Sequence, residues 1–473
     1  MKYFYITTTL PYVNAEPHIG FGLEIVKADV IARWHRELGD EVFFNTGVDE
    51  HGTKIYTKAK ELGLEPQVYC DTMAAKFGLL KEALNLSYNN FIRTTDKMHI
   101  EAAQEFWRRS LANGDIYKKA YKIKYCVGCE LEKTESELVN GHCPLHPNQE
   151  LELIDEENYF FKFSKYQEPL LKFYEEQQDF VLPGRRFNEI KSFTKHGLED
   201  FSISRLKTKM PWGVAVPDDN EQVMYVWFDA LINYISCLGW PDGDNFKKFW
   251  PGVQICGKDN LRQQSAMWQA MLMSVGVANS TQVLVNGFIG VDGVKMSKSL
   301  GNVVDPLVLV KEYGTDAVRY YLLAEMNPFE DSDFSADKFR ARYMGDLANG
   351  LGNLASRVST LLAKNNISIE LDNETDQKLN EDFTLKMNKF LFNEALNVLW
   401  EVLREADAKL SNEQPWKMTE SADIAKSLIP IVKTLRQVAK LLTPLLPQTA
   451  EKLQAQFNQV NIVKGESLFP RLD

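Results

Sequence analysis

The stretch that decides the fold is MKYFYITTTLPYVNAEPHIGFG, residues 1–22. Tyr3 to Thr9 alternates aromatic and β-branched residues, which predicts a buried strand. From His18 onward, apolar residues recur at helical spacing and predict a helix that ends at Gly39. A strand, a short loop and a helix opening on Pro-His-x-Gly form a phosphate site, because free backbone N–H groups and the helix dipole face the ligand. In such a site His18 can donate a hydrogen bond to phosphate, and Gly20 lacks the Cβ that would hold a nucleotide away.

A second stretch, Lys295-Met296-Ser297-Lys298-Ser299, follows a predicted strand over residues 282–288. Two lysines and two hydroxyls within a short loop suit a polyphosphate, although Lys-x-x-Lys alone is typical of a solvated surface. The combination with the N-terminal turn is more specific. Together the two stretches resemble the signature motifs of class I aminoacyl-tRNA synthetases, His-Ile-Gly-His and Lys-Met-Ser-Lys-Ser.

The composition is that of a multidomain globular protein. A chain of 473 residues with 44% hydrophobic and 25% charged residues predicts two to four domains with ample core. No apolar run approaches the ~18 residues of a spanning helix, and no signal peptide precedes the first strand, so we expect a cytoplasmic protein without a membrane partner. A net charge of −11 argues against indiscriminate nucleic-acid binding but leaves room for a local basic face that binds tRNA.

Strands and helices alternate through much of the chain, which predicts a parallel α/β sheet. The predicted strands after the first are residues 41–48, 91–95, 222–228, 254–256 and 282–288. Asp49 directly follows one of them, where such sheets bind ligands, although it could equally cap the next predicted helix, residues 53–62. The corner Gly257-Lys258-Asp259-Asn260 also suits a phosphate or a ribose. No Gly-x-Gly-x-x-Gly follows these strands, which argues against a nicotinamide or flavin enzyme.

Two cysteine-containing pairs predict a metal site. Cys126 and Cys129 are followed by Cys143 and His146, the spacing of a tetrahedral zinc knuckle with three thiolates and one imidazole. A redox Cys-x-x-Cys would have no use for the second pair. Four protein ligands leave no open position, so we expect a structural role. His142 could replace His146, but the pair spacing favours His146.

Strand signals fade after about residue 336, and amphipathic helices predict a separate bundle. These helices are expected over residues 344–362, 383–410, 422–441, with a kink at Pro430, and 447–457. Such a bundle could serve dimerisation or a partner. Joined to a synthetase-like half, it is better interpreted as the tRNA-binding part.

Further motifs resemble the methionyl-tRNA synthetase family over essentially the whole chain. They are Thr9 to Tyr12, Asp49 to Lys54, the cysteine knuckle, Gly197 to Arg205, Tyr225 to Ala230 and Asp346 to Arg357. The resemblance implies an α/β fold in which a Rossmann-type catalytic domain is interrupted by a zinc-knuckle connective insertion and followed by an α-helical anticodon-binding bundle. The implied divisions are residues 1–116 and 222–280 (catalytic domain), 117–221 (insertion), 281–335 (lysine loop and stem-contact segment) and 336–473 (bundle).

The same resemblance implies ligation of L-methionine to tRNA(Met) through methionyl-adenylate, with ATP and Mg²⁺ as the nucleotide complex. His18, Gly20, Gly257 and Asp259 would then bind ATP, and Lys295 and Lys298 would stabilise the leaving pyrophosphate. Asn353 and Arg357 would read the CAU anticodon from one helix face. Asp49 would hold the substrate ammonium in a pocket formed by Leu10, Tyr12, Trp227, Ala230, Leu231, Tyr234 and Gln264. For Trp227 and Tyr234, a place in the core is the structural alternative.

Three residues depart from the family pattern. Phe21 stands where the signature has its second His, Gln264 where a pocket His is usual, and Asn260 where an apolar residue is usual. No clear aromatic residue for stacking on the anticodon occurs near residues 461–464.

Two alternatives remain open at this point. The chain could be another class I synthetase, although residues 117–221 are too few for the editing insertion of the enzymes for branched amino acids, and the closed knuckle differs from the catalytic zinc of the cysteine enzyme. It could also be a catalytically idle paralogue that binds RNA. No appended dimerising domain follows the predicted bundle, so we expect a monomer.

Overall fold

A six-stranded parallel sheet forms the centre of the protein, in the order β3-β2-β1-β12-β13-β7. The computed structural model describes residues 2–129, 131–133, 137–296, 301–370 and 375–472. β1 lies at the centre of the sheet, and its Ile6 is paired with both Val253 and Phe44. The strand order reverses between β1 and β12, so we expect ligands at the carboxyl ends of these two strands. The six strands are β1 (Tyr3–Thr8), β2 (Glu41–Val48), β3 (Asn90–Arg93), β7 (Val181–Leu182), β12 (Val253–Gly257) and β13 (Gln282–Asn286).

Helix α1 (Ile19–Glu37) links the sheet to the rest of the molecule. It packs against β1, β2 and β12 and against α13 (Thr315–Ala324). Most of its residues are buried, including the charged Glu24, Lys27 and Asp29. Around the sheet lie α2 (Thr53–Glu61), α3 (Pro66–Gly78), α4 (Leu80–Ala83), α5 (Lys97–Ala112), α8 (Val226–Ala230), α9 (Asn233–Ser236), α10 (Asp244–Phe249) and α11 (Trp268–Ser274).

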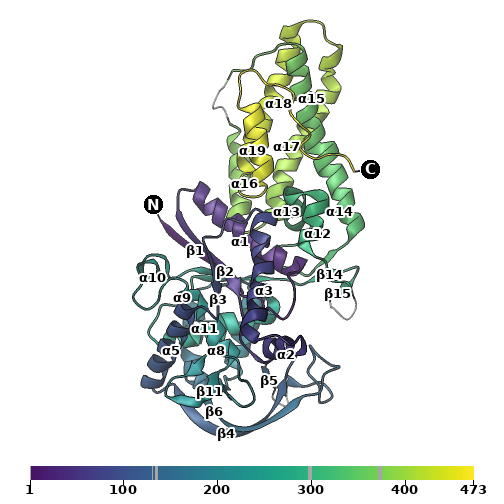
Figure 1. Cartoon of the computed structure of the whole chain (residues 1–473). Coiled ribbons are helices and arrows are strands. Elements are labelled where there is room, and N and C mark those ends of the chain that lie inside the picture. The colour runs from purple at the N-terminus through teal and green to yellow at the C-terminus, as the bar shows by residue number, and fades with distance from the viewer. Residues whose placement is uncertain (1, 130, 134–136, 297–300, 371–374, 473) are drawn as a thin grey trace.

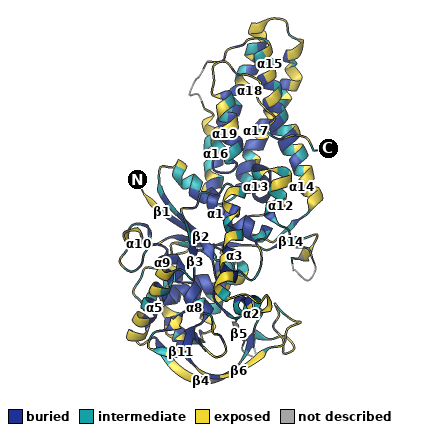
Figure 2. Ribbon diagram, viewed as in Figure 1, coloured by how far each residue is buried: buried dark blue, intermediate teal, exposed yellow. Residues whose placement is uncertain are grey.

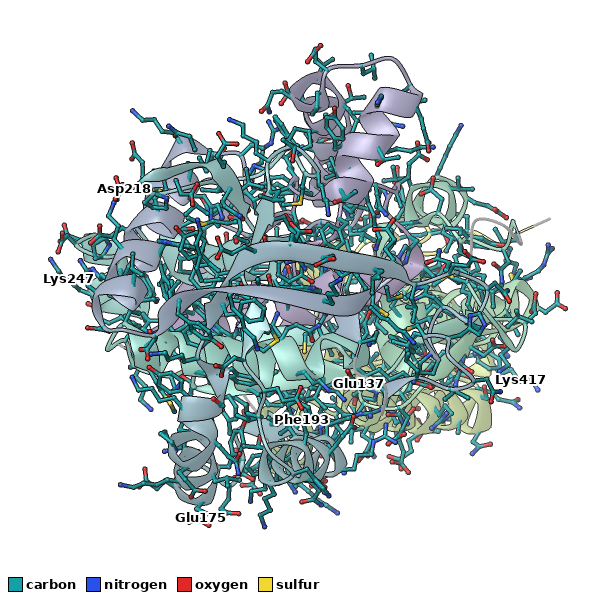
Figure 3. All side chains as sticks on the ribbon, turned by 90° about the horizontal axis from the view of Figure 1, so that it is seen from below. Glu137, Glu175, Phe193, Asp218, Lys247 and Lys417 are labelled. Atoms are coloured by element: carbon teal, nitrogen blue, oxygen red, sulfur yellow. The ribbon has the colours of Figure 1, made fainter. Side chains whose placement is uncertain are left out.

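Two antiparallel sheets lie beyond α5, at the lower end of the molecule in Figure 1. The first contains β4 (Ile116–Cys126), β5 (Leu131–Lys133), β6 (Glu152–Phe161) and β8 (Phe201–Ser202), and the second β9 (Ser204–Leu206), β10 (Ala215–Val216) and β11 (Asp219–Met224). This region also contains α6 (Gln167–Glu176), α7 (Gly184–Lys195) and β7, which joins the edge of the parallel sheet. Arg262, which precedes the π-helical turn Gln263–Met267, contacts this region: it pairs with Glu137 at 2.7 Å and lies 4.3 Å from the ring centre of Phe193, and Figure 3 labels both partners.

The C-terminal part is helical and extends away from the sheet (Figure 1). A small sheet of β14 (Ile289–Val291), β15 (Val294–Lys295) and β16 (Ser332–Phe334) precedes it. Figure 2 shows the buried faces of its helices turned toward one another. These helices are α12 (Pro306–Tyr313), α14 (Ala336–Arg342), a π-helical segment (Tyr343–Gly352), α15 (Asn353–Lys364), α16 (Gln377–Asn388), α17 (Phe392–Glu413), α18 (Ser421–Leu441) and α19 (Pro447–Phe457).

Several predicted boundaries were wrong. The strand expected over residues 222–228 ends at Met224, and the next residues form α8. The helix expected over residues 383–410 breaks between α16 and α17, where Phe390 has φ 58°. The helix expected over residues 422–441 is α18, which continues through Pro430 without a break. Within the described part of the chain, no helix is both long enough and apolar enough to cross a membrane.

Candidate functional site

Two adjoining cavities of about 340 and 490 Å³ lie at the carboxyl ends of β1 and β12. They form one cleft, because Thr9, Pro11, Tyr12, Asp259, Asn260 and Phe288 line both. The smaller cavity is lined by the residues predicted to bind methionine. The larger is lined by His18 and Gly20 of the N-terminal turn.

His18 caps helix α1 with its own ring. The Nδ1 atom accepts the backbone N–H of Gly20 at 3.1 Å, so in the neutral ring the proton is on Nε2. A Cβ on Gly20 would lie only 2.9 Å from Cε1 of His18, so the glycine first of all leaves room for this capping ring. The predicted set of free N–H groups is partly wrong, because that of Ile19 also has a partner, the carbonyl of Val304 at 2.9 Å.

The described residues on either side of positions 297–300 lie at the N-terminal turn, beside the larger cavity. Met296 lines this cavity, and its Cε would lie 3.5 Å from a Cβ on Gly20. On the other side of the loop, Val304 accepts the hydrogen bond from Ile19. Both flanks of residues 297–300 therefore contact the start of α1. Lys298 lies outside the described residues, and only the backbone of Lys295, in β15, is described.

Asp259 follows β12 in a short 3₁₀ turn, Lys258–Asn260, and lines both cavities. A Cβ on Gly257 would lie 2.6 Å from Asp259 Oδ1, so this glycine allows the carboxylate to approach the backbone. Sequence reasoning missed Glu24, a carboxyl that also lines the larger cavity and accepts the N–H of Thr9 at 2.9 Å. Burial raises the pKa of Glu24 to about 7, despite the opposing hydrogen bonds from Thr9. The one feature of the sequence that could have indicated Glu24 is its charge within a helix of mostly apolar residues.

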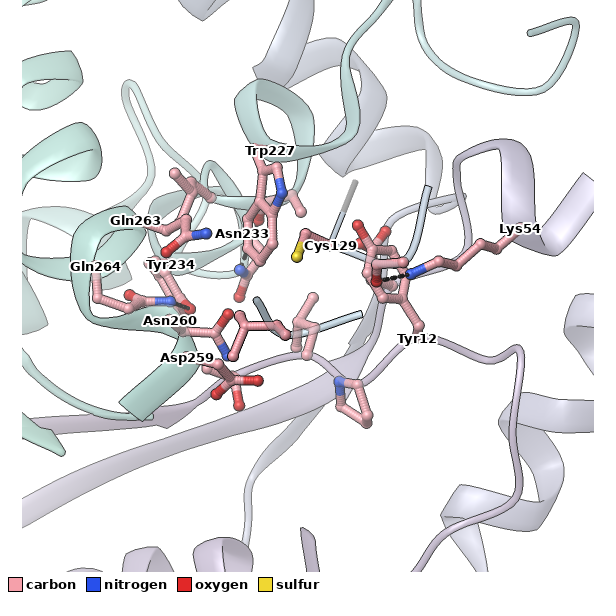
Figure 4. Close-up of a pocket in the computed structure, with 18 of the residues that line it drawn as sticks. Tyr12, Lys54, Cys129, Trp227, Asn233, Tyr234, Asp259, Asn260, Gln263 and Gln264 are labelled. Atoms are coloured by element: carbon pink, nitrogen blue, oxygen red, sulfur yellow. Dashed lines mark hydrogen bonds between the residues drawn. The ribbon is translucent and has the colours of Figure 1, made fainter. Parts of the chain in front are cut away.

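All eight residues predicted for the methionine pocket line the smaller cavity, as Figure 4 shows for most of its lining. They are Leu10, Tyr12, Asp49, Trp227, Ala230, Leu231, Tyr234 and Gln264. The rings of Tyr12 and Trp227 meet edge to face at 6.4 Å. Asp49 is buried beside them and accepts a hydrogen bond from Thr94 at 3.2 Å. It is not the cap of α2, because Gly52 takes that position and no side chain caps the helix.

The smaller cavity is more polar than the sequence predicted. Asn233 and Gln263 add side-chain amides to that of the predicted Gln264, and Gln263 and Gln264 lie in a π-helical turn, Gln263–Met267. Such turns often occur at functional sites. Among the described residues, the Asn233 Oδ1, Gln263 Oε1 and Trp227 Nε1 atoms are buried without a hydrogen-bond partner. Buried polar atoms normally have partners, so these atoms are available to a ligand or to water.

A buried network holds two walls of this cavity together. Asp229 accepts hydrogen bonds from His51 at 2.6 Å and from His99 at 2.8 Å, and His99 contacts Ser236 at 2.9 Å. His51 is two residues from Asp49, and Asp229 is two residues from Trp227. The network thus fixes the end of β2 relative to α8. The sequence contains no local signal for it, because its members are far apart in the chain.

The predicted metal ligands converge. One donor atom from each of Cys126, Cys129, Cys143 and His146 lies within 4.8 Å of the others, and His142 is outside this group. Three thiolates and one imidazole are a donor set suited to tetrahedral zinc. The knuckle needs its glycine, because a Cβ on Gly128 would lie 2.4 Å from Cγ of His146.

The metal-ligand cluster also borders the smaller cavity, to which Cys129 and His146 contribute. Lys54 of α2 donates to the carbonyl of Gly128 at 2.8 Å, and its ammonium lies 5.5 Å from the centre of the Tyr12 ring (Figure 4). Lys54 therefore connects the knuckle to the wall of the smaller cavity.

Asn353 and Arg357 lie on α15, far from the cleft in the chain. Arg357 pairs with Asp407 at 2.8 Å, and its guanidinium lies 5.1 Å from the ring centre of Trp416. Trp416 is 46% exposed and is an aromatic residue that the search near residues 461–464 missed.

A Rossmann-type sheet whose cleft is lined by the His-x-Gly turn and by Met296, the second residue of the lysine-serine motif, is typical of a class I tRNA synthetase. In agreement, the family model "tRNA synthetases class I (M)" matches residues 4–152 and 134–359. A methionine–tRNA ligase of Thermosynechococcus vestitus is 42% identical over 476 residues, covering 96% of this chain and 90% of that protein. One of Rhizobium meliloti is 41% identical, covering 95% and 90%.

Solved structures agree with these sequence relatives. Methionyl-tRNA synthetase of Mycobacterium tuberculosis in complex with methionyl-adenylate aligns with a TM-score of 0.93 at 36% identity, covering 100% of both chains. The apo form from that organism aligns with a TM-score of 0.85 at 32% identity, covering 100% of this chain and 99% of that one. The chain belongs to the methionyl-tRNA synthetase family.

Proposed function

We propose that this protein ligates L-methionine to tRNA(Met) through methionyl-adenylate, releasing AMP and pyrophosphate. The observation that carries the proposal is the single cleft. Its larger part is lined by the N-terminal turn and by Met296 of the lysine loop, and its smaller part contains Asp49 and an aromatic wall. The methionyl-adenylate bound by the M. tuberculosis relative supports the same reaction.

The methionine carboxylate attacks the α-phosphate of ATP, and the terminal ribose hydroxyl of tRNA then takes the methionyl group. Catalysis of this kind depends on positioning and on stabilisation of charge. We assign His18 and Gly20 to the phosphates, Gly257 and Asp259 to the ribose, and Lys295 and Lys298 to the leaving pyrophosphate. Asp49 binds the ammonium group. Leu10, Tyr12, Trp227, Ala230, Leu231, Tyr234 and Gln264 surround the thioether chain.

The metal assignments follow from donor chemistry. Cys126, Cys129, Cys143 and His146 would hold one structural Zn²⁺, which would stabilise the knuckle against the cavity wall. Mg²⁺ would enter with ATP as part of the substrate.

The chain divides into domains with separate roles, and we assign the anticodon of the tRNA to the helical bundle. We propose residues 1–116 and 222–280 as the catalytic domain, 117–221 as the insertion, 281–335 as the stem-contact segment and 336–473 as the anticodon-binding domain. Asn353 and Arg357 would read the CAU anticodon, and exposed Trp416 beside Arg357 would stack on an unpaired base.

We place the reaction in the cytoplasm, where tRNA is charged. The monomeric state stays a prediction that light scattering tests.

The test is ATP–pyrophosphate exchange by the purified protein with each amino acid, followed by charging of tRNA(Met). Methionine should support exchange, and Asp49→Asn should raise the KM for methionine while leaving the KM for ATP near that of the wild type. Exchange with a different amino acid would contradict the substrate. No exchange with any amino acid would favour the idle, RNA-binding paralogue.

A further inference from the structure

Asn286, the last residue of β13, holds a buried amide at the larger cavity. The residue is 6% exposed and is part of the lining of this cavity. Its Oδ1 atom accepts a hydrogen bond from Lys27 Nζ at 3.0 Å, whereas its Nδ2 atom is buried without a hydrogen-bond partner among the described residues. Buried amide N–H groups normally have partners. The protein therefore leaves one donor unpaired at this wall of the cleft.

Lys27 of α1 determines which end of this amide faces the cavity. Lys27 is 3% exposed, and its ammonium donates to the carbonyl of Pro328 at 2.6 Å as well as to Asn286. An ammonium group only donates hydrogen bonds, so the oxygen of the Asn286 amide must face it. Lys27 is not one of the described residues that line the larger cavity. The nitrogen is therefore the end of the amide that is left for the cavity.

The segment that contains Pro328 is itself fixed against the end of β13. A Cβ on Gly287 would lie 2.2 Å from the carbonyl carbon of Glu330, so the two backbones are in close contact. Asp331 Oδ1 accepts the backbone N–H of Phe288 at 2.9 Å. The Pro328 carbonyl, and with it the ammonium of Lys27, is thus held beside Asn286. Turning the amide over would place its N–H groups against a buried cation, which is unfavourable.

The order of the strands indicates which part of a nucleotide meets Asn286. β1, β12 and β13 are neighbours in the parallel sheet, and Gly257 of β12 is paired with Asn286. The turn with His18 follows β1, and Asp259 follows β12. With the phosphates at the first position and the ribose at the second, as assigned above, the base lies at the end of β13.

We propose that Asn286 Nδ2 donates a hydrogen bond to a ring nitrogen of adenine, and that Lys27 is the positioning residue that presents this donor. Adenine has three ring nitrogens with a free lone pair, N1, N3 and N7, and each can accept such a bond. Asn286 then contributes to the selection of the nucleotide. This inference rests on the proposed function, because it takes ATP as the occupant of the larger cavity.

The experiment measures kcat/KM in methionine-dependent pyrophosphate exchange for ATP and for 1-deaza-, 3-deaza- and 7-deaza-ATP, each of which replaces one ring nitrogen by C–H. Burial lowers the pKa of Lys27 to about 7, so the assays are run below pH 7, where Lys27 is protonated. The wild type should prefer ATP over one of the three analogues about threefold to tenfold, the value of one hydrogen bond.

Two variants remove the donor in different ways. Asn286→Asp keeps an oxygen for Lys27 but has no N–H, and Asn286→Leu removes the amide altogether. Both should abolish the preference for ATP over that analogue. Lys27→Met, which removes the ammonium that orients the amide, should lower the same preference. Because each result is a ratio of two nucleotides in one variant, a general loss of activity does not affect it, and Asn286→Asp serves if Asn286→Leu folds poorly.

Arg33→Met is the matched control for Lys27→Met. Arg33 is a cation on the same helix, but it donates to Asp29 at 2.8 Å and to the carbonyl of Asn85 at 2.6 Å, so the preference should stay at the wild-type value.

Three results would overturn the inference or a part of it. Normal exchange with equal kcat/KM for ATP and all three analogues, or with an unchanged preference in both Asn286 variants, would refute the donor and leave the proposed function intact. A preference that Asn286→Asp abolishes but Lys27→Met, at the wild-type melting temperature, retains would refute the role of Lys27. Absence of exchange with ATP in the wild type would overturn the proposed function and this inference with it.

Discussion

Asp229 is fully buried, with one imidazole on each carboxylate oxygen. Burial by itself raises the pKa of Asp229, but the charge and hydrogen bond of His51, together with His99, outweigh burial and lower it from 3.8 to about 2. Since the folded-state pKa is the lower one, ionised Asp229 stabilises the fold above pH 3.8, and the contribution is lost as pH falls toward 2. Its size is about 2 kcal/mol.

Asp229→Asn removes this contribution and leaves both imidazoles with a weaker partner. We expect the free energy of unfolding in urea to fall by about 2 kcal/mol at neutral pH. The difference from the wild type should shrink as pH drops below 3.8. A difference that does not change with pH would show that the Asp229 charge does not stabilise the fold.

Gly20 and Gly22 offer a matched pair on one helix. A Cβ on Gly20 would lie 2.9 Å from Cε1 of His18, whereas a Cβ on Gly22 would make an ordinary 3.8 Å contact with Pro306. Gly20→Ala should displace the His18 ring and lower kcat/KM for ATP at least about thirtyfold, because one donor to developing charge contributes about 2 kcal/mol or more. Gly22→Ala should remain near the wild type. Equal kcat/KM in the two variants would refute this role of His18.

At the residue scale, the sequence predicted side chains that belong to contiguous motifs. His18 was predicted from a helix that opens on Pro-His-x-Gly and Asp49 from its place at the end of a strand, and both line the cleft. Glu24 and the partners of Asp229 were missed, because their environment is created by segments distant in the chain. Gln263 was also missed, because only the structure shows that its Oε1 atom is buried in the cavity wall without a hydrogen-bond partner among the described residues.

At the scale of elements, hydrophobic periodicity predicted most strands and helices and failed where tertiary contacts end an element. Residues 225–228 are apolar enough for a strand. However, the backbone N–H of Tyr225 donates to the carbonyl of Ile203 at 2.8 Å, and the chain then turns into α8. The break between α16 and α17 contains neither glycine nor proline. Phe390 instead adopts positive φ with its ring packed on the core, which no local pattern indicates.

The metal knuckle is an element whose stability depends on one glycine. A Cβ on Gly128 would lie 2.4 Å from Cγ of His146 and 2.5 Å from Oε1 of Gln149. Gly128→Ala should push the imidazole away and weaken zinc binding about tenfold or more, as other losses of ligand orientation do. The measurement is zinc release to a chromophoric chelator.

Gly184→Ala is the control for the knuckle variant, because a Cβ there meets no atom within 4 Å. It should release zinc at the wild-type rate. Equal release from all three proteins would show that the crowding at His146 does not govern metal retention.

At the scale of the whole molecule, the bundle is less separate than its sequence predicted. Trp34 of α1 packs edge to face on Phe383 at 5.9 Å and donates to Asn388 at 3.0 Å, so one hydrophobic core runs from the parallel sheet into the bundle. The sequence predicted helices with apolar faces in both the sheet domain and the bundle. It could not show that they cover each other, because periodicity identifies an apolar face but not its partner.

Arg319 of α13 is the charged contact at this junction, and it is completely buried. It pairs with Asp29 of α1 at 2.8 Å and donates to the carbonyl of Leu445, in the bundle, at 2.9 Å. The arginine therefore joins the first helix of the sheet domain to the turn between α18 and α19. A shift of this turn would move the bundle relative to the cleft.

Arg319→Met should lower the free energy of unfolding by about 3 kcal/mol, because Asp29 loses a buried partner. It should also lower tRNA charging more than ATP–pyrophosphate exchange, since exchange needs only the cleft whereas charging needs the bundle and the cleft in register. Arg436→Met is the control, because Arg436 donates to three carbonyls within the bundle, those of Phe457, Glu370 and Gln459. If exchange and charging fall by the same factor in Arg319→Met, the arginine stabilises the fold without orienting the bundle. If both variants separate the two activities equally, bundle stability rather than the junction accounts for the effect.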